Sequence, residues 1–208
     1  MNEIPRGNRG GVIRRFVLVA MVTGIILLAA CGSGSSTRMY LFWADGASTI
    51  GRANLDGTGA NQAFISTGGT FPYMLTVSSG YLYWTNPLSG TIGRAAINGT
   101  GVNQQFISVP NGPTGVAGLD VTSRYIYWTN EGGGAIGRAD LDGTGVNQQF
   151  ITGAIGPTDL AVGSGYIYWT NPNTGTIGRA DVNGTAAEQR FITVQTGRPL
   201  GVTLGPGS

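Results

Sequence analysis

Four tryptophans recur at a nearly constant spacing, and this repeat limits the possible folds of the chain more than any other feature. Trp43, Trp84, Trp128 and Trp169 are 41, 44 and 41 residues apart. Three of them lie in the hexapeptides YLYWTN, YIYWTN and YIYWTN, and the first lies in the weaker copy YLFWAD. A fixed period near 40 residues indicates an array of one supersecondary unit. We therefore expect four copies of one small structure.

Each copy carries the signals of four short antiparallel strands. In the third copy the apolar stretch 113–121 precedes YIYW, and GAIGRADL follows. The turn 142–145 then leads into NQQFIT, and its Asp-Gly pair supplies the positive φ that tight hairpins require. Four such strands in a repeat of this length are typical of one β-propeller blade. We expect an all-β propeller of four four-stranded blades, with repeats at 39–70, 71–112, 113–156 and 157–197.

The alternation of side chains in YIYW predicts burial on both faces of the strand. The two tyrosines face one way, and the isoleucine and tryptophan face the other. A blade stacked between two neighbouring blades satisfies this requirement. In the following strand, Gly137 and Ala139 share a face. We expect these small residues to let an adjacent sheet approach closely.

Two linked motifs resemble the YWTD repeat of low-density-lipoprotein-receptor-type β-propellers. The family pattern, YWTD followed by IxRAxLDG, corresponds to residues 127–143 and to similar pairs in the other three copies. The resemblance covers the chain after residue 38 and implies a β-propeller. Asn86, Asn130 and Asn171 replace the family's aspartate in three copies. Asparagine can hold a turn through side-chain hydrogen bonds, but it lacks the charge.

The number of copies leaves the closure of the propeller open. The family propeller has six blades, whereas this chain has four copies, and only Gly32–Arg38 precede the first YLFW. The segment 198–204, RPLGVTL, resembles the inner strands of the other copies. One hypothesis is that 198–204 is a closing strand that completes the first blade and closes a ring. The alternatives are an open arc of four blades, or two chains that pair into a larger ring.

Residues 1–30 have the pattern of a secretory leader. Arg14 and Arg15 precede the apolar run from Phe16 to Ala30, which is shorter than the about 20 residues of a membrane span. The end of this run resembles the lipobox of bacterial lipoproteins, which implies cleavage before Cys31 and a diacylglyceryl thioether on its sulfur. Two or more acyl chains anchor a protein stably. We expect residues 31–38 to be a flexible tether that holds the domain outside the cytoplasm, in a bacterial cell envelope.

Composition argues against several classes of function. Histidine, the commonest general base and metal ligand, is absent from the sequence. The single cysteine excludes an intramolecular disulfide and a cysteine-based zinc site. Beyond residue 30, eight arginines oppose nine acidic residues, so the net charge is about −1 and no nucleic-acid partner is expected. We also expect no metal and no cofactor.

Recurrent polar residues favour structural roles. An arginine recurs in every copy, at Arg52, Arg94, Arg138 and Arg179. Recurrence favours stacking on aromatic rings or pairing with carboxylates over a ring of cations around a ligand. Asn98-Gly-Thr and Asn183-Gly-Thr match glycosylation sequons, but they occupy the turn position of Asp-Gly-Thr in other copies. We interpret both as turns.

Variation among the copies is confined to two sets of connections. The turns between third and fourth strands are nearly identical, whereas the turns between second and third strands and the connections between blades differ. In a propeller these two variable sets lie on one face, and variation collected there suggests binding. We call it the variable face, and its candidate binding residues are Pro87, Leu88, Asn111, Glu131, Pro172, Asn173 and Arg198.

The sequence thus predicts a membrane-anchored extracytoplasmic propeller that binds a protein or glycan through the variable face, without enzymatic activity. A propeller-fold lyase or lactonase-like hydrolase is the alternative from another class. The absence of histidine, and only Asp120 and Asp159 near inner strands, argue against it. A further alternative is a partial propeller that works only as a homo-oligomer.

Overall fold

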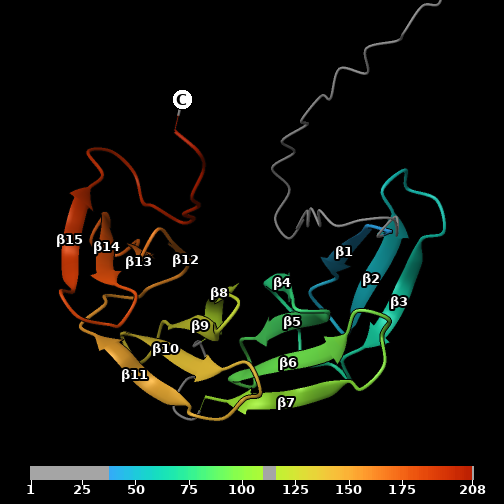
Figure 1. Cartoon of the computed structure of the whole chain (residues 1–208). Coiled ribbons are helices and arrows are strands. Elements are labelled where there is room, and N and C mark those ends of the chain that lie inside the picture. Colours follow the sequence, from blue (N-terminus) through green and yellow to red (C-terminus); the bar gives the residue numbers. More distant parts are fainter. Residues whose placement is uncertain (1–37, 110–115, 208) are drawn as a thin grey trace, which may run out of the picture.

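The computed structural model describes residues 38–109 and 116–207, which form fifteen β-strands in four antiparallel sheets (Figure 1). The leader, Cys31 with most of the tether, and Asn111 lie outside these residues. Within the described part of the chain, no helix is long and apolar enough to cross a membrane. The all-β prediction is confirmed.

Each sheet is built from one sequence copy, and strands adjacent in sequence pair within it. Blade 1 contains β1 (Tyr40–Ala44), β2 (Thr49–Asn54) and β3 (Asn61–Ser66). Blade 2 contains β4 (Leu75–Ser78), β5 (Tyr81–Asn86), β6 (Thr91–Ala96) and β7 (Asn103–Ser108). Blade 3 contains β8 (Val116–Val121), β9 (Tyr125–Asn130), β10 (Ala135–Asp140) and β11 (Asn147–Thr152). Blade 4 contains β12 (Leu160–Gly163), β13 (Tyr166–Asn171), β14 (Thr176–Asp181) and β15 (Glu188–Thr193).

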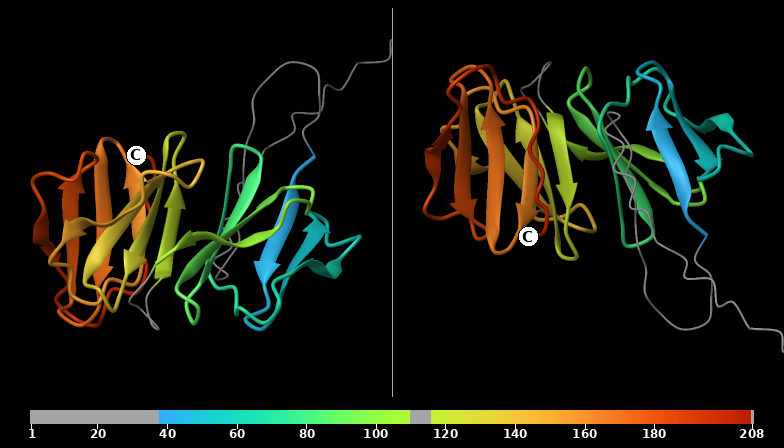
Figure 2. Two further views of the ribbon diagram at one scale, coloured as in Figure 1. Left: turned by 90° about the horizontal axis from the view of Figure 1, so that it is seen from below. Right: turned by 90° about the horizontal axis from the view of Figure 1, so that it is seen from above.

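The blades stand side by side in an open arc, with β4, β8 and β12 on its inner side and β3, β7, β11 and β15 on its outer side (Figure 1). Figure 2 views the arc from below and from above, and shows the strands running between two edges where the hairpin turns gather. Blade 1 and blade 4 are the two ends of this arc.

The hypothesis that residues 198–204 complete blade 1 is corrected by this arrangement. Blade 1 is a three-stranded sheet, and residues 198–204 form no strand. They lie beside blade 4, where the Val202 amide donates to Asp159 Oδ2 at 2.9 Å. The segment follows β15 after only a few residues, so it stays at the end of the arc that blade 4 occupies. The open arc is the arrangement of the described residues.

The hydrophobic core lies between blades, and each internal interface uses the same kinds of residue. The preceding blade contributes an aromatic ring and two isoleucines, and the following blade contributes an aliphatic residue, a tryptophan and an alanine. Between blades 2 and 3 these residues are Tyr83, Ile92, Ile107, Ile126, Trp128 and Ala139. The interfaces on either side repeat the pattern. Trp84, Trp128 and Trp169 are fully buried, which confirms their predicted place in the core.

The glycine of each third strand makes room for an indole of its own blade. Gly93 is the cross-strand partner of Trp84, and Gly137 is the partner of Trp128. A Cβ at either glycine would overlap the tryptophan ring, and Gly51 and Gly178 repeat the arrangement. The expectation that Gly137 admits the neighbouring sheet is therefore wrong, because the space is filled by Trp128.

Two of the asparagines that replace the family's aspartate, Asn86 and Asn171, are fully buried and use both ends of their amides. Asn86 Nδ2 donates to Thr91 Oγ1 at 3.0 Å and to the Gln104 carbonyl at 3.3 Å, while its Oδ1 accepts from Thr70 Oγ1 at 2.9 Å. Thr70 belongs to the connection from blade 1, so this bond links two blades. Asn171 repeats the pattern with the Ile155 amide as donor at 3.0 Å. A neutral amide thus supplies a donor that a carboxylate lacks.

The recurrent arginines and turn residues have the predicted structural roles. The Arg94 guanidinium lies 4.6 Å from the centre of the Tyr81 ring and 3.8 Å from that of Phe106. The other three arginines stack in the same way on a tyrosine and a phenylalanine. In the turn at Asn98, its Oδ1 accepts from the Thr100 amide at 3.1 Å and from its hydroxyl at 2.7 Å. Asn183 makes the same bonds, so both sequons are turns.

Candidate functional site

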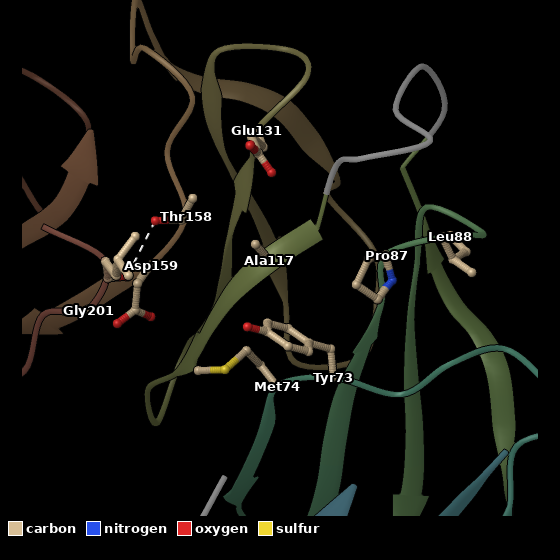
Figure 3. Close-up of a pocket in the computed structure, with 10 residues that line it drawn as sticks. Tyr73, Met74, Pro87, Leu88, Ala117, Glu131, Thr158, Asp159 and Gly201 are labelled. Atoms are coloured by element: carbon tan, nitrogen blue, oxygen red, sulfur yellow. Dashed lines mark hydrogen bonds between the residues drawn. The ribbon is translucent and has the colours of Figure 1, made fainter. Parts of the chain in front are cut away.

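A pocket of about 710 Å³ lies where the starts of the inner strands meet the turns that follow β5 and β9. Its walls come from blades 2, 3 and 4 and from the C-terminal segment (Figure 3). Tyr73 and Met74 stand at the start of β4, Asp159 at the start of β12, and Ala117 of β8 between them. The remaining lining residues are Pro87, Leu88, Glu131, Thr158, Leu200 and Gly201.

A recurrent proline precedes three pairs of these lining residues. Tyr73 and Met74 follow Pro72, Thr158 and Asp159 follow Pro157, and Leu200 and Gly201 follow Pro199. Proline fixes φ near −65° and starts an extended segment without donating a backbone bond. The two residues after each of these prolines line the pocket, at three successive positions around the arc.

Large apolar side chains are unusually exposed in this concave site. The exposed fractions are 57% for Tyr73, 62% for Leu88 and 67% for Leu200. Ligand pockets are mostly apolar and carry a small number of polar groups that fix orientation. Apolar side chains gathered in a hollow indicate a surface that a partner covers.

Two carboxylates, Glu131 and Asp159, line the pocket, and no arginine does so among the described residues. Burial raises the pKa of Asp159, and the nearby Asp120 raises it further, although the Val202 and Leu160 amides oppose the shift. Burial also raises the pKa of Asp120, against hydrogen bonds from the Val162 and Val121 amides. The pocket is therefore acidic, and protonation of Asp159 is favoured relative to a free carboxyl.

The two aspartates also fasten neighbouring inner segments together. Asp120 Oδ2 accepts from the Val162 amide of β12 at 2.8 Å, which joins blade 3 to blade 4. Asp159 Oδ2 accepts from the Val202 amide at 2.9 Å, which joins blade 4 to the C-terminal segment. Thr158 Oγ1 adds a bond to the Leu200 carbonyl at 3.3 Å (Figure 3).

The structure divides the candidate residues of the variable face into two groups. Pro87, Leu88 and Glu131 line the pocket. Pro172, Asn173 and Arg198 form a separate cluster, in which Arg198 Nε donates to the Pro172 carbonyl at 3.2 Å and Arg198 Nη2 to Asn173 Oδ1 at 2.8 Å. Asn111 lies outside the described residues.

Both variable sets of connections lie along one edge of the blades. The Val109 amide after β7 bonds to the Gly90 carbonyl at 2.8 Å, and the Val194 amide after β15 bonds to the Gly175 carbonyl at 2.8 Å. These bonds hold each outgoing connection next to the turn between the second and third strands of the same blade.

Sequence reasoning missed the part of the pocket that the inner strands supply. The residues missed are Tyr73, Met74, Ala117, Thr158, Leu200 and Gly201, and Asp159 was noted only as near an inner strand. Their neighbours in sequence are apolar, so the pattern predicted buried inner strands and not the lining of a pocket. The signal that could have found all of them except Ala117 is the variation in the two positions after each recurrent proline. Among the described residues, no group of three or more histidine, cysteine or acidic side chains is placed to hold a metal ion.

No protein-family model matches the chain, and no curated protein matches it. Several solved structures are similar to the chain. The chain is 23% identical to virginiamycin B lyase from Staphylococcus aureus, covering 84% of this chain and 56% of the lyase, with a TM-score of 0.63. A variant of that lyase with one histidine replaced by alanine is described as catalytically inactive.

Two further structures come from proteins of other kinds. The chain is 26% identical to a chain of a nidogen/laminin complex, covering 78% of this chain and 64% of that one, with a TM-score of 0.64. It is 16% identical to a putative 6-phosphogluconolactonase from Bacteroides uniformis, covering 74% of this chain and 52% of that one, with a TM-score of 0.57. The chain thus spans between about half and two thirds of the length of these structures. These likenesses show that the chain has the β-propeller fold, which binding modules and enzymes share.

Proposed function

We propose that the chain is a lipid-anchored extracytoplasmic binding module whose pocket takes an apolar group beside a cationic group of a protein partner. The observation that carries the proposal is the pairing of exposed Tyr73 and Leu88 with the carboxylates of Glu131 and Asp159 in one hollow.

The apolar part of the pocket supplies the affinity. Tyr73 offers a rigid ring, and Leu88 and Met74 offer flexible aliphatic surface. Tyrosine side chains are enriched at interfaces because they bury a large area at a low cost in entropy. A leucine-sized or aromatic side chain of the partner fits such a surface.

The carboxylates fix the orientation of the bound partner. Glu131 lies in the turn after β9, and none of the arginines in the part of the chain that the structure describes lines the pocket to neutralise it. A lysine or arginine of the partner would form a charge-assisted hydrogen bond with this carboxylate. Complementary charge increases the association rate and excludes acidic partners.

Peptide display tests the proposed binding. A random nine-residue peptide library is selected against the immobilised protein, the Glu131→Lys and Leu88→Asp variants, and the Leu55→Asp variant. Leu55 is a matched control, because it is 55% exposed in the turn between β2 and β3, outside the pocket. We expect the wild type and the control to enrich peptides with an apolar residue next to lysine or arginine. Failure to enrich any sequence, or enrichment that is the same on all four proteins, would refute the proposal.

The anchor is supported by the leader, the lipobox-like end and the single Cys31. Mass spectrometry of the membrane fraction should find an N-terminal peptide that begins at Cys31 and carries the diacylglyceryl thioether. The Cys31→Ser variant should lose this modification and leave the membrane fraction. An unmodified Cys31 in the mature protein would contradict the anchor.

An enzyme is the second candidate, and Asp159 is the observation in its favour. A pocket carboxyl with a raised pKa is suited to proton transfer, and the fold is shared with a lyase. Against it, the chain has no histidine, whereas the lyase variant that lost one is inactive. A screen of lyase and lactonase substrates, together with metal analysis of the purified protein, distinguishes the enzyme from the binding module. Turnover that Asp159→Asn abolishes would favour the enzyme over the binding module.

A further inference from the structure

The two end blades expose the surfaces that every internal interface buries. On blade 4, Ile192 is 45% exposed. Its equivalents in the other blades, Ile65, Ile107 and Ile151, are no more than 2% exposed. On blade 1, Trp43 is only partly buried, whereas the tryptophans of the other three blades are fully buried.

These two surfaces are the complementary halves of one interface. In each internal interface the isoleucines of the preceding blade pack against the tryptophan of the following blade. Blade 4 presents the first half at Ile192, and blade 1 presents the second half at Trp43. They lie at opposite ends of the arc, so they do not meet within this chain (Figure 1).

The strands at the two ends are complementary as well. In the described residues, β1 has β2 on one side and no inner strand on the other. The C-terminal segment occupies the place of an inner strand after blade 4. Its bond from Val202 to Asp159 Oδ2, at 2.9 Å, repeats the bond from Val162 to Asp120 Oδ2, at 2.8 Å. Among the described residues, the segment has an inner strand's position but pairs with no strand.

We propose that a second copy of this chain docks head to tail on the first. Blade 4 of one copy packs on blade 1 of the other, and residues 199–204 pair with the neighbour's β1 as its missing inner strand. Two such contacts join two arcs of four blades. Propellers contain four to eight blades, so the product is a closed ring at the upper end of that range. Closure at two identical contacts ends the assembly at the dimer.

The contact extends an interface that the chain already makes three times, which is why a second copy is the partner. It needs no new side-chain chemistry, because Ile192 would pack on the indole of Trp43 as Ile107 does on that of Trp128. The free edge of β1 and the exposed apolar faces would be covered in the same step. This inference is independent of the ligand that the pocket binds.

Sedimentation equilibrium of the full chain in density-matched detergent tests the proposal. The Ile192→Glu variant places a charge in the proposed contact at a residue that is exposed in a single copy. The Val146→Glu variant is the matched control, because Val146 is 42% exposed on blade 3, an internal blade. We expect twice the single-chain mass for the wild type and the control, and the single-chain mass for Ile192→Glu.

Hydrogen exchange of the β1 amides tests the strand pairing in the same samples. The amides of Tyr40–Ala44 that do not bond to β2 should be protected at least tenfold more in the dimer than in Ile192→Glu. A single-chain mass for the wild type at all concentrations overturns the proposal, and so does a dimer that Ile192→Glu leaves intact. A single-chain mass with protected β1 amides would mean that the C-terminal segment pairs with β1 of the same copy. This result would also overturn the proposed dimer.

Discussion

At the scale of single residues, the cross-strand pairing of glycine with tryptophan determines how flat each blade is. Gly93 carries no side chain, so the Trp84 indole lies across its backbone and the blade presents an even face to its neighbour. The repeat of this pair in all four blades explains why the motif keeps glycine at this position.

Replacing Gly93 by alanine should destabilise the protein by about 1 to 3 kcal/mol, because the new methyl group overlaps the fully buried Trp84 ring. Chemical denaturation measures the change. Both glycine variants are made in the Ile192→Glu chain. The matched control is Gly51→Ala, where the same overlap meets Trp43, which is partly exposed in a single copy and free to shift. Equal losses in the two variants would contradict this account of the glycine.

The buried asparagine of the WTN motif gives a second prediction. Asn86→Asp replaces the amide donor by a carboxylate, which faces the Gln104 carbonyl in a fully buried site. We expect a loss of about 2 kcal/mol of unfolding free energy, since a buried acceptor loses its donor. The matched control is the same change at Asn98, an exposed turn residue whose place in other copies is taken by Asp56 and Asp142 with the same hydrogen bonds. If the protein tolerates Asn86→Asp as well as Asn98→Asp, the amide bonds contribute little.

Asp159 gives a prediction for the pH dependence of stability. Its pKa is raised in the folded state, so protonation stabilises the fold and stability is lost as the pH rises through that pKa. The contribution of Asp45 to the pH dependence of stability has the opposite sign. Hydrogen bonds from Thr49, Ala47 and Ser48 outweigh its burial and lower its pKa to about 2. The stability of Asp159→Asn relative to wild type should therefore increase between about pH 3 and pH 7. A difference that stays constant or falls over this range would exclude the raised pKa.

At the scale of elements, the sequence was most informative where a strand carries a motif. YIYWTN and the Asp-Gly turns predicted the second, third and fourth strands of each blade, because alternation and turn chemistry are local properties. The position of the C-terminal segment is not local. RPLGVTL has the composition of an inner strand, but which blade it accompanies depends on where the arc ends.

The pocket was predictable only in part, for a related reason. Pro87, Leu88 and Glu131 differ between copies in short turns, and such variation is visible in one sequence. Tyr73 and Asp159 belong to inner segments whose apolar composition resembles the core. Their place in the pocket follows from the curvature of the arc, which leaves the starts of the inner strands open to the concave side.

Deleting residues 199–207 should reduce the free energy of unfolding by about 2 kcal/mol, since Asp159 loses its Val202 donor and β12 loses its cover. The matched control deletes only residues 205–207, which are exposed. Thermal and chemical unfolding of both variants measures the difference. Equal stability of the two would mean that the segment adds nothing to blade 4.

At the scale of the whole molecule, stacking of blades through repeated tryptophans is the central claim. It explains why the internal blades are closed on both faces while the end blades are not. It also connects the arc to full-length propellers, because the chain covers 56% of the Staphylococcus aureus lyase with the same fold.

Hydrogen exchange of the four indole N–H groups in the Ile192→Glu chain tests this claim most directly. In a single arc, Trp84, Trp128 and Trp169 are enclosed between blades, whereas Trp43 faces the open end. The account predicts three slowly exchanging indole groups and one that exchanges much faster, which is Trp43. Fast exchange at Trp84, Trp128 or Trp169 would contradict it.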